Sequence, residues 1–349
     1  MTTTDRAADA DLTGSSGWLD PAPYLRGVAW RDDGRPVRAD PADLDRLPWD
    51  TAERAAVPVG VRLEFTARGA TAVDIRYRAA LPTRADELRD LAHTFALWHD
   101  GALVTEVTEA PERETVVRIG LPDRRGRFTV HPPESQCPEI LGLRPVGGSI
   151  TPAPPQPRWL VHGDSITEGW WSTRPAHAWP AAAGRALGLD AVNLGHAGAG
   201  RGELAVAQQM AGLPADVLTL AFGTNCWSRT PFSAPLLYET VRAFVGLVRQ
   251  GHPGTPMLVL SPVLRPEAER TPNALGATLA DLRTALEEAT RARVASGDDR
   301  LALLPGRDIL GPEHLADGLH PNDTGHALMA EAVTAALRGT GFVTPSDRP

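Results

Sequence analysis

Lysine does not occur in this sequence: all 35 Lys or Arg residues are arginine. This absence excludes a Schiff-base lysine, the lysine of a phosphate-binding P-loop and a serine–lysine dyad. Cysteine is almost as rare, and Cys137 and Cys226 do not make a disulfide framework. No apolar run approaches the length that crosses a bilayer. We therefore expect no membrane partner.

Charge and composition narrow the class of protein further. The 349 residues carry a formal net charge of -8, which argues against a nucleic-acid partner because phosphate contacts need clustered basic residues. Residues 1–17 are polar and acidic and contain neither the basic nor the apolar region of a secretory signal. We expect a disordered tail at 1–17 and a cytoplasmic protein.

The region 18–146 has the pattern of an all-β domain. Apolar and polar side chains alternate in short stretches separated by Gly, Pro and Asp, which predicts an antiparallel, jelly-roll-like β-sandwich. The stretch 84–91 has a helical pattern instead. The predicted strands are 59–66, 72–78, 94–98, 103–104, 115–119 and 127–130.

The segment 147–157 contains four prolines and two glycines and is expected to be a linker. The secondary-structure pattern changes after it. From 158 to 340, buried-type strands alternate with helices, before a short tail at 341–349. This alternation predicts a parallel sheet with helices on both faces, a three-layer α/β/α domain of flavodoxin-like type. The strands are expected at 158–161, 191–194, 217–222 and 257–261, and the helices at 176–187, 203–211, 236–250, 274–296 and 323–338.

Polar and glycine-rich loops follow the first three of these strands, at the edge where α/β sheets bind ligands. Ser165 follows the first strand, Gly198 the second and Asn225 the third, and Asp317 and His320 precede the last helix. A serine nucleophile needs an imidazole base, and the base needs a third group that orients it. Ser165, His320 and Asp317 fit these roles. The backbone N–H groups of Ser165 and Gly198 and the Asn225 amide fit the oxyanion donors.

These residues resemble the motifs of the SGNH hydrolases, also called GDSL esterases, over residues 158–338. The resemblance implies the α/β/α fold with a catalytic triad at one edge of the sheet. One departure is that Cys226 stands where the family often has aspartate. The region 18–146 resembles the sandwich that precedes this domain in some carbohydrate esterases and natural-product acyltransferases. The matching motifs are Gly163-Asp164-Ser165, Gly198, Gly223-x-Asn225 and Asp317-x-x-His320.

Other residues near the motif loops are candidates for substrate contact. Trp170, Trp171 and Trp227 cluster around the motif loops. One or two of them, with Trp170 and Trp227 as the candidates, are proposed to line an acyl pocket, although ordinary core packing is an equal alternative. Arg265 lies after the fourth strand and is a candidate contact for an anionic acyl donor, unless its charge is simply solvated.

No spacing among His314, His326 and the triad residues matches a metal-ligand motif, so we expect no metal. We also expect no cofactor, because Gly198-x-Gly200-x-x-Glu203 lacks the last small residue of a dinucleotide fingerprint and follows the second strand rather than the first.

Three functions compete at this point. The first is an esterase that cleaves an acyl ester of a small molecule or carbohydrate through an acyl-enzyme on Ser165. The second is an acyltransferase that moves an acyl group from an acyl-CoA or ester donor to a hydroxyl of a natural product. The third, disfavoured by the intact motifs, is a non-catalytic carbohydrate-binding protein. The sandwich is expected to dock against the catalytic domain rather than hang on a free linker.

Overall fold

The structure, a computed structural model, describes residues 17–79, 94–108 and 114–343. The helix predicted at 84–91 lies outside the described residues, as do nearly all of the tail predicted at 1–17 and most of the tail predicted at 341–349.

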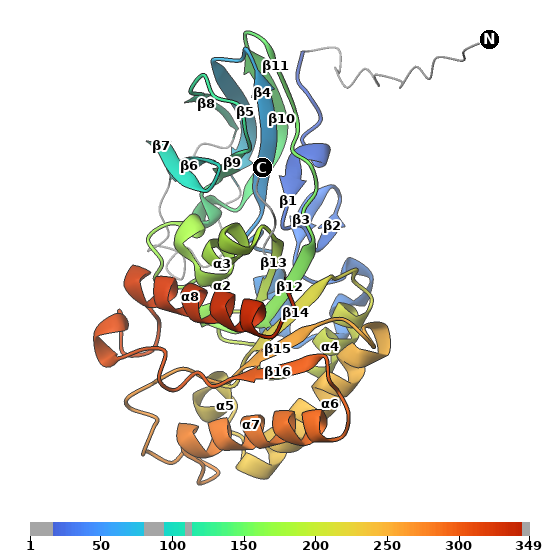
Figure 1. Ribbon diagram of the computed structural model, residues 1–349, viewed down its shortest axis with the longest axis vertical. Helices are drawn as coiled ribbons and strands as arrows, with labels where there is room; N and C mark the ends of the chain where they lie inside the picture. The colour runs from blue at the N-terminus through green and yellow to red at the C-terminus, as the bar shows by residue number, and fades with distance from the viewer. Residues whose placement is uncertain (1–16, 80–93, 109–113, 344–349) are drawn as a thin grey trace, which may run out of the picture.

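Two antiparallel sheets form the N-terminal part (Figure 1). Their facing side chains make one core that includes Phe65, Tyr77, Phe95 and Phe128, so the predicted sandwich is confirmed. A separate hairpin lies beside them. The first sheet has the order β1 (Leu25–Arg26), β4 (Arg62–Arg68), β9 (Phe128–His131), β6 (Thr94–His99) and β7 (Ala102–Thr108), with β11 (Ser149–Pro152) also on β4; the second has the order β10 (Pro138–Val146), β5 (Ala72–Ala79) and β8 (Thr115–Gly120); the hairpin is β2 (Trp30–Asp32) and β3 (Arg35–Val37).

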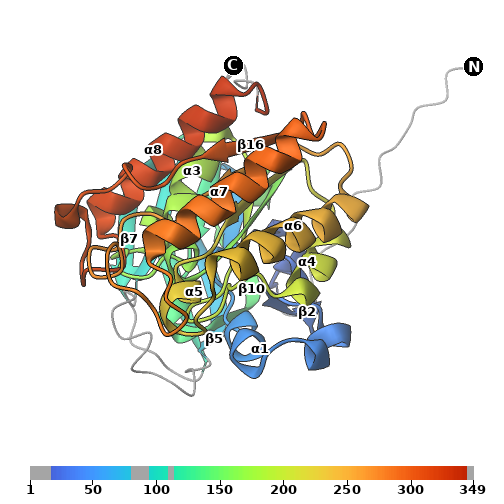
Figure 2. The same cartoon turned by 90° about the horizontal axis from the view of Figure 1, so that it is seen from below.

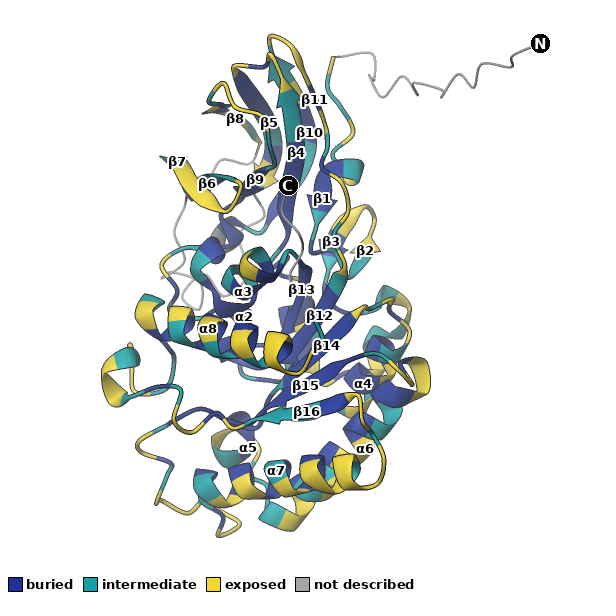
Figure 3. Cartoon of the chain, in the orientation of Figure 1, coloured by how far each residue is buried: buried dark blue, intermediate teal, exposed yellow. Residues whose placement is uncertain are grey.

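Five parallel strands form the sheet of the C-terminal part, and most of their residues are buried (Figure 3). Burial on both faces explains their continuous apolar sequences. The fifth strand is four residues long and was missed by the sequence pattern. The order across the sheet is β13 (Asp190–Gly195), β12 (Arg158–Gly163), β14 (Val217–Ala221), β15 (Met257–Leu260) and β16 (Leu301–Leu304).

Helices cover both faces of this sheet, as predicted (Figure 2). α3 (Trp179–Leu187) and α8 (Asp323–Gly339) pack on one face. The other face carries α4 (Leu204–Ala211), α6 (Ala234–Gly251) and α7 (Leu279–Ala295). The remaining helical turns are η1 (Ala22–Tyr24), η2 (Pro41–Arg46), α1 (Trp49–Ala55), η4 (Glu134–Gln136), α2 (Ser165–Glu168), η5 (Pro175–His177), α5 (Asn225–Ser228) and η6 (Pro312–His314).

Part of the N-terminal region packs into the α/β core rather than into the sandwich. Ala39, Leu47 and Ala55 belong to the same apolar cluster as α4 and α6. The side chain of Gln209 on α4 also donates to the carbonyl of Asp43 at 3.2 Å. The segment 39–55 therefore completes the core of the parallel sheet.

Strand pairing holds the segment that precedes β12, and a buried ion pair joins the sandwich to the parallel sheet. Within the predicted linker at 147–157, β11 pairs antiparallel with β4. Arg62 on β4 bonds to Asp190, the first residue of β13, at 2.9 Å, and Asp190 also accepts from the backbone N–H of Gly27 at 2.8 Å. These contacts tie the sandwich to the start of the parallel strands.

No helix among the described residues is both long enough and apolar enough to cross a membrane.

Candidate active site

Ser165 lies at the start of α2, directly after β12. Asp164 is the N-cap of this helix, and its Oδ1 accepts from the N–H of Ile166 at 3.0 Å. Burial raises the pKa of Asp164 to about 7. Gly200, which has φ +68°, packs against this turn so closely that a Cβ there would lie 2.4 Å from the Gly163 carbonyl oxygen. The cap and the close packing fix the turn that presents Ser165.

The structure brings Ser165, His320 and Asp317 together in one line of hydrogen bonds. Ser165 Oγ lies 2.8 Å from His320 Nε2, and His320 Nδ1 lies 2.7 Å from Asp317 Oδ2. Asp317 Oδ1 accepts from the backbone N–H of His320 at 2.8 Å and of Leu319 at 3.0 Å. Asn322 caps α8 just beyond this turn. The predicted triad residues therefore meet although 155 positions separate Ser165 from His320.

Partial burial and mutual hydrogen bonding shift the pKa values of His320 and Asp317. Burial lowers the pKa of His320, although the hydrogen bond and charge of Asp317 raise it. For Asp317, burial raises the pKa, but the hydrogen bonds and charge of His320 outweigh it and hold the pKa below its usual value. At neutral pH the imidazole is thus uncharged and able to accept a proton, beside an ionised carboxylate.

The three predicted oxyanion donors come from loops after neighbouring strands. Gly163 at the end of β12 is in register with Gly195 on β13 and Ala221 on β14, so the following loops open side by side. Gly198 adopts φ +73°, a conformation that glycine allows. The side-chain amide of Asn225 donates to the carbonyl of Ala199. Since an amide carries two N–H donors, this bond fixes the Asn225 side chain and leaves one donor.

The candidate substrate residues lie in different settings. The Trp170 ring is stacked on the His320 imidazole, with centroids 5.6 Å apart. Trp227 donates from Nε1 to the Thr271 carbonyl at 2.8 Å, and the Arg265 guanidinium lies 4.5 Å from its ring centroid. The charge of Arg265 also lowers the pKa of His320. Trp170 therefore contacts the His320 ring, and Arg265 acts on His320 through its charge.

Three further residues surround this site: sequence reasoning missed Arg229 and Glu168, and it did not predict the bond that Trp171 makes. Trp171 donates from Nε1 to Asp317 Oδ2 at 2.9 Å. The exposed guanidinium of Arg229, at the end of α5, has its carbon 3.6 Å from the point where a Cβ on Gly198 would lie. Glu168, at the end of α2, is buried among arginines of the N-terminal region. Proximity in sequence to the motifs was the available signal for all three.

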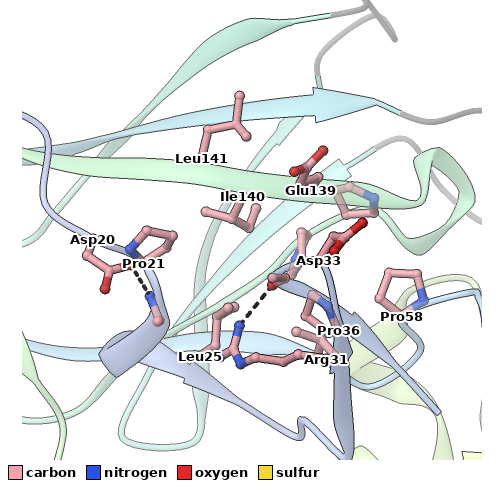
Figure 4. Close-up of a pocket in the computed structure, with 15 residues that line it drawn as sticks. Asp20, Pro21, Leu25, Arg31, Asp33, Pro36, Pro58, Glu139, Ile140 and Leu141 are labelled. Atoms are coloured by element: carbon pink, nitrogen blue, oxygen red, sulfur yellow. Dashed lines mark hydrogen bonds between the residues drawn. The ribbon is translucent and has the colours of Figure 1, made fainter. Parts of the chain in front are cut away.

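A separate cavity of about 340 Å³ lies in the N-terminal part (Figure 4). Its walls combine prolines with Leu25 and Ile140, and the polar side chains Arg31, Asp33 and Glu139 are also exposed in it. None of the predicted site residues lines this cavity. Over the described ranges of the chain, no cluster of three or more His, Cys, Asp or Glu residues is placed to hold a metal ion.

Comparison with known families identifies the C-terminal part. Residues 161–328, which include the triad residues and the oxyanion loops, match the GDSL-like lipase/acylhydrolase family. The chain carries a GDSL-like lipase/acylhydrolase domain. The resemblance inferred from the motifs is thereby confirmed. Among curated proteins, nothing matches the chain.

Solved structures match both the GDSL-like domain and the part before it. The salicylyl-acyltransferase SsfX3 from a tetracycline biosynthetic pathway is 26% identical with a TM-score of 0.80, over 92% of this chain and 96% of that one. A family two carbohydrate esterase from Clostridium thermocellum is 17% identical with a TM-score of 0.61, over 81% of this chain and 93% of that one. One from Cellvibrio japonicus is 18% identical with a TM-score of 0.58, over 81% and 89%. The two carbohydrate esterases share the fold of this chain over the matched residues.

Proposed function

We propose that this protein is a serine acyl-ester enzyme that forms an acyl-enzyme on Ser165. The observation that carries the proposal is the line of two hydrogen bonds, of 2.8 and 2.7 Å, from Ser165 through His320 to Asp317. In this mechanism His320 Nε2 takes the proton of Ser165 as Oγ attacks the acyl carbonyl carbon. Asp317 holds the imidazole in the tautomer whose Nε2 accepts that proton.

The tetrahedral intermediate carries its negative charge on the former carbonyl oxygen. The N–H groups of Ser165 and Gly198 and the free donor of Asn225 are the proposed hydrogen-bond donors to this oxygen. When the intermediate collapses, His320 returns its proton to the leaving alkoxide and the ester bond breaks. Water then attacks the acyl-enzyme with His320 again as base, which releases the acid and restores Ser165.

An acyltransferase is the second candidate, with an alcohol in place of that water. The similarity to SsfX3 over 92% of the chain favours it. Two arginines beside the site add support, because they suit an anionic donor such as an acyl-CoA. Arg229 lies against Gly198, and Arg265, over the Trp227 ring, is close enough for its charge to lower the pKa of His320. An acylated sugar or natural product remains the proposed substrate of the hydrolytic reaction.

A fluorophosphonate probe tests the nucleophile. We expect it to label Ser165 alone, and we expect Ser165→Ala to abolish turnover of every acyl ester. Labelling at another residue, with activity surviving the substitution, would remove the proposal.

A substrate panel tests hydrolysis against transfer. Acyl esters and acyl-CoA thioesters are each incubated with and without alcohol acceptors, and the products are identified by mass spectrometry. A free acid as the only product in the presence of every acceptor favours the esterase. A new ester that depends on Ser165 identifies the acyltransferase. Arg265→Ala should raise KM for the acyl-CoA donors more than for neutral esters.

A further inference from the structure

Glu168 is a buried carboxylate at the end of α2, three residues after Ser165, and only 4% of its surface is exposed. Four groups donate to it. Its Oε1 accepts from the Arg54 guanidinium and from Trp170 Nε1, the latter at 3.0 Å. Its Oε2 accepts from Arg38 at 3.3 Å and from the backbone N–H of Ala197 at 2.9 Å. Although burial raises the pKa of Glu168, the charges and hydrogen bonds of these partners outweigh it, so the carboxylate is ionised.

Both arginines come from the N-terminal region and reach deep into the GDSL-like domain. Arg38 also donates to the carbonyls of Gly195, at the end of β13, and of Val57, the latter at 2.7 Å. Arg54 lies on α1, and its guanidinium carbon is 5.8 Å from the ring centroid of Trp170. The N-terminal region therefore supplies the two positive charges that balance Glu168.

Two of the bonds to Glu168 lead directly to the reacting groups. The indole of Trp170, bonded through Nε1, has its ring stacked on His320 at an interplanar angle of 29°. Ala197, bonded through its N–H, immediately precedes the proposed oxyanion donor Gly198. One carboxylate thus fixes a neighbour of the base and a neighbour of the oxyanion loop.

We propose that Glu168, held by Arg38 and Arg54, is a positioning residue for the acyl-transfer step. It holds the Trp170 ring against the imidazole of His320 and fixes the backbone at Ala197, so that the N-terminal region sets the geometry of the site. The inference rests on the proposed roles of Ser165 and His320.

Glu168→Gln tests it, because glutamine keeps the size of the side chain and removes its charge. With p-nitrophenyl acetate we expect kcat to fall on the order of 10²-fold while KM stays within about twofold, since the contact acts on the reacting groups and not on the substrate. The charged and titratable groups that face His320 are Asp317, Glu168, Arg265 and His326. Of these only Glu168 changes, and because its charge raises the pKa of His320, the acid limb of the rate should also move to lower pH.

A matched control separates positioning from simple stability. Asp190→Asn removes the buried ion pair with Arg62, which also joins the N-terminal region to the GDSL-like domain. Asp190 is the first residue of β13, at the end of the strand away from the site. We expect this variant to lose thermal stability and to keep the kcat of the wild type. If Glu168→Gln does not fold, Trp170→Phe replaces it, because phenylalanine keeps a ring against His320 and removes the donor to Glu168. Its kcat should also fall.

Fluorophosphonate labelling separates this inference from the proposed function. We expect Ser165 to be labelled at least tenfold more slowly in Glu168→Gln or Trp170→Phe than in the wild type or Asp190→Asn. Misplaced reacting groups that lower kcat on the order of 10²-fold should also slow the reaction of Ser165 with the probe. Labelling at the wild-type rate in these variants, with only a lower Tm, would overturn the positioning role and leave the nucleophile in place. If Ser165 of the wild type is not labelled, both proposals fail.

Discussion

The indole Nε1 of Trp171 donates to Asp317 Oδ2 at 2.9 Å, and the same oxygen accepts from His320 Nδ1 at 2.7 Å. Trp171 reaches this position with φ +67°, a left-handed conformation that is uncommon for a residue other than glycine. Such strain is concentrated at functional sites. A tryptophan next to the nucleophile loop thus stabilises the carboxylate that orients the proposed base.

Replacement of Trp171 by phenylalanine should therefore slow the reaction. Loss of a hydrogen bond to a charged group is worth about 1.5 kcal/mol or more, so kcat should fall about tenfold, with a smaller change in KM. Steady-state kinetics on a small acetyl ester measure kcat and KM of Trp171→Phe and of the wild type. Trp18→Phe, in the N-terminal part, is the matched control and should leave kcat as it is. Equal rates for Trp171→Phe and the wild type would mean that this bond does not act on Asp317.

The pH dependence of kcat/KM should show one ionisation on its acid side, because His320 must be uncharged to accept the Ser165 proton. Burial lowers the pKa of His320 from 6.5, so the midpoint should lie below 6.5 and the rate should be level at pH 8. The positive charge of Arg265 also lowers this pKa, so Arg265→Gln should move the midpoint to higher pH. A midpoint that moves to lower pH in Arg265→Gln would contradict this arrangement.

Removal of the Asn225 amide tests the oxyanion donors. Asn225→Ala should lower kcat on the order of 10²–10³-fold, about 2.7–4 kcal/mol, with little change in KM, because the donor acts on charge that develops only in the transition state. The bond from Asn225 to the Ala199 carbonyl offers another reading, in which the side chain only braces the loop. An unchanged kcat together with a lower Tm would support that reading.

Stability should also depend on pH through Glu134, whose carboxylate accepts from the N–H of Gly60 at 2.6 Å. Burial raises its pKa from 4.5 to about 7, so the folded protein favours the protonated form. This contribution is complete below pH 4.5 and is lost as pH rises through 7, at a cost of about 3 kcal/mol. Glu134→Gln should therefore raise the free energy of unfolding at pH 8 and leave it nearly unchanged at pH 4.5.

Denaturant unfolding at these two pH values measures the effect of Glu134→Gln. Glu288→Gln, on the exposed side of α7, is the control and should alter neither value. A gain that is equal at both pH values would show that the substitution acts through packing and not through ionisation.

A chain that begins at Pro155 should fail to fold into an active domain. It lacks Arg38 and Arg54, so both ion pairs of Glu168 beside Ser165 would be lost. It also lacks Leu47 and its neighbours in the core of the sheet. Circular dichroism and activity on acetyl esters measure the outcome. A folded, fully active product would show that the N-terminal region is dispensable.

The sequence allowed us to predict which residues meet at the candidate site, because strand ends and short motifs are local patterns. Ser165, Gly198 and Asn225 each follow a recognisable buried strand, and the parallel arrangement alone brings their loops to one edge. Neither Arg38 nor Arg54 could be assigned in this way, since each meets Glu168 across more than 110 positions and only the tertiary fold joins them. β16 was missed because its four residues include no β-branched side chain, whereas the equally short β15 contains Val259.

The position of segment 39–55 has a consequence for synthesis on the ribosome. Leu47 packs in the cluster formed with α4, which begins at Leu204, so its partners emerge more than 150 residues later. At about 5–20 residues per second, the interval is on the order of 8–30 seconds. During this time Ala39, Leu47 and Ala55 lack the apolar cluster in which they are buried in the folded protein. Segment 39–55 thus waits for helices that are synthesised much later, so this segment cannot finish folding before the parallel-sheet domain does.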